Sequence, residues 1–211
     1  MAFTSNSELV ASLVSSGVLQ TPRLRTAFLA VDRARFVPLS LRAEAYADHP
    51  LPIGLGQTIS QPTTIAFMLE LLQPPPGGTI LEVGAGSGYV AALLAEVVGK
   101  SGRVVAMEHV PELAQRAEQV LRTFNFPQLA VVARDGSHGY AQFAPYDRIL
   151  VSAAAQALPS VFEAQLGKTS RLVIPVGGGI QDIVLVRYQD SLRQEKHYPG
   201  FVFVPLLGNG K

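Results

Sequence analysis

Apolar and polar positions divide the chain into two stretches with different patterns. In residues 1–76, apolar residues with helical spacing predict helices over 7–17 and 22–32 and a third beginning at Pro62. Residues 35–62 show no such spacing and are rich in proline and glycine, so we predict a long loop there. Long loops in compact domains are usually functional or disordered, and the apolar residues of this one argue against disorder.

From residue 79 onward, short apolar runs alternate with helical patterns. Helices are expected after the first run, over 111–123 and over 158–166, and the expected strands are 79–83, 103–108, 129–133, 146–154, 171–177, 182–188 and 201–206. The alternation predicts an α/β fold: a doubly wound, mostly parallel, Rossmann-like sheet of seven strands with helices on both faces, the last strands being antiparallel. We expect residues 1–76 to extend a core of residues 77–211 within one compact domain.

Composition narrows the chemistry that this fold can carry. Of 211 residues, 48% are hydrophobic and 16% charged, and 17 Lys and Arg against 16 Asp and Glu leave a net charge of +1. A near-neutral chain lacks the basic surface that attracts nucleic acid. The absence of cysteine excludes disulfides, thiolate zinc sites, iron–sulfur clusters and a cysteine nucleophile. The four histidines have no metal-ligand spacing, so we expect no metal and a reaction that needs few reactive side chains.

The sequence contains no recognisable targeting signal. The first residues lack the basic start and the apolar run of a signal peptide, and no run reaches the ~18 apolar residues of a membrane span. We therefore expect a cytoplasmic protein that binds neither membrane nor nucleic acid. We also expect a monomer.

A glycine-rich turn directly follows the first strand of the second stretch and opens a helix. It consists of Gly84, Ala85, Gly86, Ser87 and Gly88. Glycines let the chain turn tightly and let a ligand approach the backbone. Glu108 ends the next strand about 20 residues later, where a carboxylate can accept hydrogen bonds from both hydroxyls of a ribose. Together these features predict a nucleoside cofactor at the carboxyl ends of the two strands.

The chemistry of the turn selects the cofactor. Its spacing is G-x-G-x-G, whereas dinucleotide sites have G-x-G-x-x-G. Glu82 precedes the turn, where a carboxylate repels a pyrophosphate and attracts an ammonium or a sulfonium group. S-adenosyl-L-methionine carries both cations and no phosphate, so it is the cofactor that we predict. A dinucleotide site, and a turn that only packs a helix on a strand, are the alternatives.

A second polar turn, Asp135-Gly136, follows the third strand of this stretch and falls at the same sheet edge. Asp135 can accept a hydrogen bond from an adenine amino group, although Asp-Gly is also common in simple turns. The predicted cofactor-binding residues are Glu82, Gly84, Ala85, Gly86, Ser87, Gly88, Glu108, His109, Asp135 and Gly136.

Longer phrases of the chain resemble a known family. The most specific are GQTISQP at residues 56–62 and APYDRILVSAAAQALP at residues 144–159, and the colinear matching segments are 45–72, 80–96, 133–159, 165–177 and 203–206. The chain resembles the protein-L-isoaspartate O-methyltransferases, which are class I S-adenosylmethionine-dependent enzymes. The resemblance implies methylation of the free α-carboxylate of L-isoaspartyl residues in damaged proteins and peptides, with S-adenosyl-L-homocysteine as the product.

The same resemblance implies the substrate residues. Ser60 matches the active-site serine of the family, and its hydroxyl would orient the acceptor carboxylate. The predicted substrate-binding residues are Gln57, Thr58, Ile59, Ser60, Ala153, Ala154 and Val204. The chain departs from the family pattern at Thr63, where a larger aromatic residue or a histidine is usual, and at residues 167–170, which replace a K-x-G-G turn.

Methyl transfer to a carboxylate suits this composition. The acceptor is already ionised at pH 7 and the leaving thioether is neutral, so the reaction needs alignment and exclusion of water but no general base or metal. Two other functions stay open: a carboxyl methyltransferase for another peptide or small-molecule acid, and a cofactor-binding module without activity. The near-neutral charge disfavours an RNA methyltransferase.

Asn209-Gly210, near the C-terminus, is the dipeptide most prone to succinimide formation, because glycine leaves its amide nitrogen open to the asparagine side chain. We hypothesise that the enzyme forms isoaspartate in this tail and methylates it on a neighbouring copy.

Overall fold

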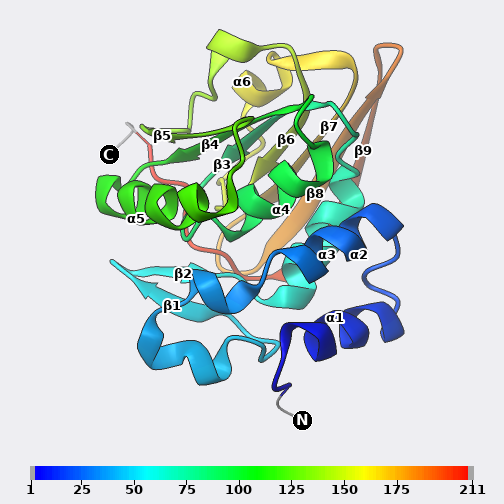
Figure 1. The fold of residues 1–211 in the computed structure, drawn as a ribbon. Coiled ribbons are helices and arrows are strands. Elements are labelled where there is room, and N and C mark those ends of the chain that lie inside the picture. Colours follow the sequence, from blue (N-terminus) through cyan, green and yellow to red (C-terminus); the bar gives the residue numbers. More distant parts are fainter. Residues whose placement is uncertain (1–2, 209–211) are drawn as a thin grey trace.

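A seven-stranded sheet runs through the centre of the computed structural model, which describes residues 3–208 (Figure 1). Its strands are β3 (Thr79–Val83), β4 (Arg103–Glu108), β5 (Leu129–Ala133), β6 (Tyr146–Val151), β7 (Leu166–Val176), β8 (Gln181–Gln189) and β9 (Leu192–Phe201). The α-helices are α1 (Asn6–Ser15), α2 (Pro22–Ala30), α3 (Pro62–Leu72), α4 (Tyr89–Val98), α5 (Pro111–Leu121) and α6 (Ser160–Glu163). Short 3-10 helices cover Arg33–Phe36, Leu39–Glu44, Arg122–Phe124 and Ala141–Phe143.

The strand order creates a crevice in the middle of the sheet. The order is β5-β4-β3-β6-β7-β8-β9, with β3 to β7 parallel and β8 and β9 antiparallel. From β3 the chain proceeds outward through β4 and β5, and it then returns to place β6 on the other side of β3. Ligands of such sheets bind outside the carboxyl ends of the strands where the order reverses. The doubly wound, mostly parallel sheet of seven strands is confirmed.

Successive side chains of the central strands point to opposite faces of the sheet and so belong to two different apolar layers. Ile80 and Val104 join the layer that contains α3, α4 and α5, whereas Leu81 and Val105 face the layer closed by Phe162 of α6. Figure 1 shows α6 across the sheet from α3, α4 and α5. Because both faces are covered, these strands are continuous apolar runs rather than alternating ones.

The N-terminal helices share the larger of the two apolar layers. Phe28 of α2 lies edge-on to Tyr89 of α4, with ring centroids 6.3 Å apart. Buried side chains of α1, α2 and α3 belong to the same cluster as those of α4 and the sheet. The division of the chain at residue 76 stays a prediction.

The long loop predicted over residues 35–62 is partly wrong. It contains two of the 3-10 helices and a hairpin of β1 (Leu51–Gly54) and β2 (Gln57–Ile59). Leu51 and Ile53 alternate with exposed positions in β1, but four residues that include Pro and Gly give too short a pattern to indicate a strand. The hairpin turn passes through Gly54, Leu55 and Gly56, all with positive φ.

The final predicted strand, residues 201–206, is also wrong. The last strand is β9, whose polar residues lie at the open edge of the sheet and are almost all exposed. Because almost all of its side chains face solvent, its sequence lacks the apolar run used to predict a strand. Other boundaries also differ: β6 ends at Val151 rather than at residue 154, β7 begins at Leu166, and the helix predicted over 158–166 is reduced to α6. Within residues 3–208, no helix has both the length and the apolar character needed to cross a bilayer.

Gly88 lets the glycine turn pass closely beside α5. Its φ is +85°, and a Cβ there would lie 3.1 Å from Leu121 and 3.2 Å from Ala117. Gly17 has a φ of +75°, but a Cβ there would meet nothing within 4 Å. Comparing substitutions at these two positions therefore distinguishes the effect of backbone strain from that of side-chain crowding.

We expect Gly88→Ala to lower the free energy of unfolding by about 3 kcal/mol and Gly17→Ala by about 1 kcal/mol, because both add left-handed strain but only the first also overpacks. Urea denaturation of the two variants and the unmodified protein measures the difference. Equal losses would show that crowding at Gly88 is absorbed by the neighbouring side chains.

Candidate active site

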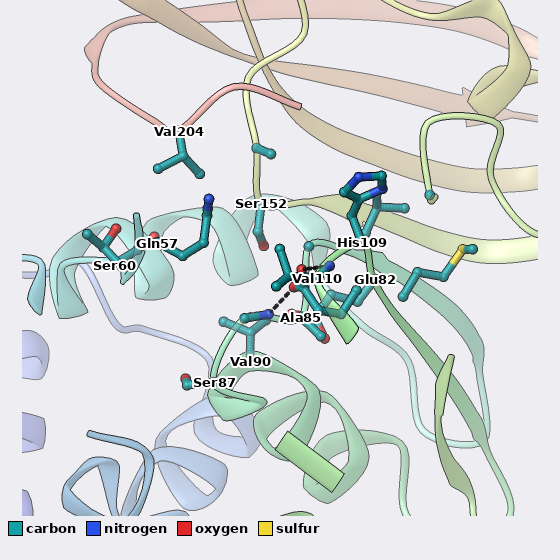
Figure 2. A pocket seen from close by; sticks show the side chains of 18 of the residues that line it. Gln57, Ser60, Glu82, Ala85, Ser87, Val90, His109, Val110, Ser152 and Val204 are labelled. Atoms are coloured by element: carbon teal, nitrogen blue, oxygen red, sulfur yellow. Dashed lines mark hydrogen bonds between the residues drawn. The ribbon is translucent and has the colours of Figure 1, made fainter. Parts of the chain in front are cut away.

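A pocket of about 790 Å³ lies at the carboxyl ends of β3, β4 and β6, between the sheet and the β1–β2 hairpin (Figure 2). Fourteen of the residues expected in the site line it: Gln57, Thr58, Ile59, Ser60, Glu82, Gly84, Ala85, Gly86, Ser87, Glu108, His109, Gly136, Ala153 and Val204. These residues come from segments far apart in the sequence, and the strand ends bring them together.

Three expected residues do not line the pocket. Gly88 lies behind the turn, where its lack of a side chain lets α4 approach α5. Asp135 accepts a hydrogen bond from the Ser137 amide at 2.8 Å, which organises the turn that presents Gly136 to the pocket. Ala154 acts through its backbone, which bonds to the C-terminal segment.

Glu108 ties the glycine turn to the next strand. Its carboxylate accepts hydrogen bonds from the Gly86 amide at 2.7 Å and the Val110 amide at 2.9 Å. Figure 2 shows these bonds as dashed lines at the floor of the pocket. The amides of Gly84 and Ala85 both donate to the Met107 carbonyl at 2.9 Å. Each Glu108 oxygen uses one lone pair in this way, so the carboxylate can still accept hydrogen bonds from a ligand.

Glu82 is a buried carboxyl group without a partner. It lines the pocket, its side chain is 0% exposed, and among the described residues neither oxygen has a hydrogen-bond donor. Burial, with a smaller effect of the Glu108 charge, raises the pKa of Glu82 to about 8. A buried charge that lacks a partner is costly, so this carboxylate is suited to pair with a cationic group that enters the pocket.

The hairpin brings Ser60 to the mouth of the pocket. Ile53 of β1 packs over the glycine turn, 3.4 Å from where a Cβ on Gly86 would lie. After β2, the chain enters α3, where Asp48 accepts bonds from the amide and hydroxyl of Thr63 at 2.9 Å and 2.7 Å. Thr63, the departure from the family pattern, thus fastens the end of this segment. Within residues 3–208, the Ser60 hydroxyl makes no hydrogen bond.

The C-terminal segment forms the opposite wall. The Ala154 amide donates to the Val204 carbonyl, and the Leu206 amide donates to the Ala154 carbonyl, both at 2.8 Å. This ladder runs parallel to the residues after β6 and turns Val204 toward the hairpin, as Figure 2 shows. Apolar residues of the segment 201–206, which was predicted as a strand, therefore form a wall of the pocket.

Several lining residues were not predicted: Ile65, Val83, Tyr89, Val90, Met107, Val110, Ser152, Pro205, Leu206 and Leu207. Val83, Met107, Val110 and Ser152 each lie within two positions of a predicted residue, so a wider window around each motif would include them. Tyr89, Val90, Pro205 and Leu206 meet the same criterion, whereas Ile65 and Leu207 carry no comparable signal. Within residues 3–208, no group of three His, Cys, Asp or Glu side chains is arranged to hold a metal ion. Asn209-Gly210 lies outside the described residues.

The sequence model of a family described as protein-L-isoaspartate(D-aspartate) O-methyltransferase (PCMT) matches residues 4–211. The chain belongs to this family. Protein-L-isoaspartate O-methyltransferase 2 of Archaeoglobus fulgidus is 49% identical over 179 residues, which cover 84% of this chain and 82% of that protein. The protein-L-isoaspartate O-methyltransferase of Methanopyrus kandleri is 46% identical over 203 residues, covering 95% and 90% of the two chains.

Solved structures agree with the protein-L-isoaspartate O-methyltransferase fold. A member from Plasmodium falciparum, crystallised with S-adenosyl-L-homocysteine, superposes with a TM-score of 0.88 at 22% identity, covering 98% of this chain and all of that one. A second protein-L-isoaspartate O-methyltransferase gives a TM-score of 0.86 at 28% identity, covering 97% of this chain and 66% of that one. At 22% identity, the first likeness establishes the fold alone.

The burial of Glu82 predicts a pH-dependent stability for this family member without ligand. Its carboxyl has a pKa of about 8 in the folded state against 4.5 for the free side chain, so the folded state binds more protons between these values. The free energy of unfolding should therefore fall as pH rises from 5 to 8, with a slope of up to about 1.4 kcal/mol per pH unit from this group.

Urea denaturation at pH 5, 6, 7 and 8 measures this slope, and Glu82→Gln is the matched control because its amide does not titrate. All other ionisable groups are common to both proteins, so the difference in slope isolates Glu82. Parallel pH profiles for the two proteins would contradict the assignment.

Proposed function

We propose that this protein transfers a methyl group from S-adenosyl-L-methionine to the free α-carboxylate of L-isoaspartyl residues in damaged proteins and peptides. The observation that carries the proposal is the pocket itself, in which an unpartnered buried carboxylate, a glycine turn tied by Glu108 and the hydroxyl of Ser60 line one space. Membership of the family and the resemblance of the hairpin phrase support the same substrate. We also propose that it acts as a cytoplasmic monomer without a nucleic-acid partner.

The residues present fit S-adenosyl-L-methionine. The orphaned oxygens of Glu82 are suited to its ammonium group, and the free lone pairs of Glu108 to the hydroxyls of its ribose. Gly136 and His109 line the side of the pocket where we place the adenine. When bound, this cofactor supplies a methyl group on a sulfonium, whose departure leaves a neutral thioether.

The protein contributes position rather than proton transfer. Ser60 would donate a hydrogen bond to one oxygen of the acceptor carboxylate and leave the other free to accept the methyl group. The acceptor is ionised at neutral pH, so no general base is required. Gln57 and Val204 line opposite walls, and closing them over a bound peptide would exclude water. Alignment of two reactants in this way supplies several kcal/mol of the barrier reduction, on the order of 7 or more in well-oriented systems.

An assay with paired peptides tests the proposed substrate. A peptide with one L-isoaspartyl residue should accept labelled methyl groups from S-adenosyl-L-methionine, and its twin with a normal L-aspartyl residue should accept at least 100-fold less. Cofactor binding with turnover of neither peptide would overturn the proposal. Equal methylation of both would favour a carboxyl methyltransferase of another specificity.

Replacing Ser60 tests how the acceptor is oriented. We expect Ser60→Ala to lower kcat about 100-fold, the usual effect of removing one well-placed donor, while the Kd of S-adenosyl-L-homocysteine stays within twofold. Ser101→Ala, in the exposed turn before β4, is the control and should leave both constants unchanged. Steady-state kinetics and calorimetric titration provide the two readouts. Equal losses of turnover and cofactor affinity would remove Ser60 from the proposed role.

A further inference from the structure

We infer that Arg33 is a positioning residue, which holds the substrate hairpin in register with the cofactor-binding turn by contacting Ala45, in the segment that leads to the hairpin, and Tyr89, the residue that directly follows the turn. The inference rests on the proposed function, which assigns the side of the glycine turn to the cofactor and the side of the hairpin to the substrate. Arg33 does not line the pocket, so it would act through the residues that it touches.

Arg33 is a buried cation with unusual contacts. It is 0% exposed, its Nε donates to the Ala45 carbonyl at 2.9 Å, and neither terminal guanidinium nitrogen has a hydrogen-bond partner in the part of the chain that the structure describes. Burial lowers the pKa of Arg33 to about 10, with Asp48 opposing the change, so the side chain stays charged at neutral pH. A buried charge with unmet donors costs several kcal/mol, and an apolar side chain would fill this space at lower cost. Stability alone therefore gives no reason for an arginine here.

On the cofactor side, Arg33 lies over an aromatic ring that belongs to the pocket. Its guanidinium carbon is 5.5 Å from the ring centroid of Tyr89, a cation–π contact. Tyr89 is the first residue of α4, directly follows the glycine turn and lines the pocket. Phe36 packs on the same ring with centroids 5.3 Å apart, so the ring is clamped from the N-terminal segment.

On the substrate side, Arg33 holds the backbone that leads to the hairpin. Ala45, whose carbonyl accepts its Nε proton, is fully buried and precedes Asp48 by three positions. Asp48 bonds to Gln61 and Thr63, on the far side of the hairpin, at 2.7 to 3.2 Å. Both ends of the segment that carries Ser60 are thus fastened beside one another, and Arg33 connects the first end to the cofactor turn.

Arg35 provides a matched control two residues away. Its guanidinium lies 3.9 Å from the ring centroid of Phe124 and donates to Thr123, so it makes the same kinds of contact. It is exposed, however, and both partners lie in the 3-10 helix that follows α5. Lysine at either position keeps a positive charge near the ring but lacks the planar guanidinium group that donates the hydrogen bond.

The decisive experiment compares Arg33→Lys with Arg35→Lys. For Arg33→Lys, we expect the KM for the isoaspartyl peptide to rise at least tenfold, while the Kd of S-adenosyl-L-homocysteine stays within threefold. Arg35→Lys should leave both within twofold. All measurements are made well below the melting temperature of each variant. A peptide KM of Arg33→Lys that equals the control value would overturn the inference, and so would equal losses of peptide and cofactor binding.

Amide hydrogen exchange gives a readout that does not depend on activity. In Arg33→Lys, exchange across residues 51–60 should accelerate at least tenfold, while exchange in β3 and β4 stays at the level of Arg35→Lys. Uniform acceleration throughout the protein would indicate loss of stability alone and overturn the positioning role. If the wild-type enzyme methylates no isoaspartyl peptide, the proposed function fails, but the exchange result still decides what Arg33 holds.

Substitutions of Tyr89 test the same connection if Arg33→Lys does not fold. Tyr89→Phe keeps the ring beneath the guanidinium and should leave hairpin exchange within twofold of wild type. Tyr89→Leu removes the aromatic face and should accelerate exchange across residues 51–60 with Arg33 intact. Identical hairpin exchange in the two Tyr89 variants would contradict the connection through this ring.

Discussion

The hydrogen bonds between Glu108 and the backbone beside it determine the shape of this site. A chain that leaves β3 and reverses into α4 within a few residues needs left-handed glycines, and it turns several amides away from regular secondary structure. Glu108 accepts from Gly86 on that turn and from Val110, which lies between β4 and α5, so one carboxylate fixes two chain segments. The floor of the pocket is therefore preformed, and its remaining acceptor capacity faces the ligand.

The same arrangement leaves Glu82 without donors. Glu82 and Glu108 sit on adjacent parallel strands whose ends meet at one edge, but the nearby amides bond to Glu108 or to the Met107 carbonyl. Burial then holds the pKa of Glu82 near 8, well above that of an exposed carboxyl group. Glu82 therefore lacks a stabilising partner within residues 3–208. A buried carboxyl group without a partner is expected where a cationic ligand completes the site.

Catalysis by alignment places unusual demands on the N-terminal segment. In the proposed reaction the acceptor is already ionised, so the rate would depend on where the acceptor is held. Short elements such as β1 and β2 cannot be rigid on their own. Their position comes from contacts with the core, through Ile53 over the glycine turn and Arg33 against Tyr89. Both contacts join the N-terminal segment to residues of the glycine turn or of α4, beside the pocket.

The serine of the hairpin phrase was predicted from the resemblance to the family. Sequence patterns alone determined the parallel sheet, the glycine turn and the acidic residue of the second strand. These features depend on local periodicity and on residue types that a turn or a cofactor requires, and both can be recognised in a single segment. Tertiary structure decided the rest. It paired β1 with β2, used the polar β9 as an edge, and made a wall of the apolar residues around Val204. It also left Glu82 without a partner and placed Arg33 between two distant segments. Those outcomes depend on which segments meet in space. No pattern along the chain predicts which hydrogen-bond donors will lie beside a buried group.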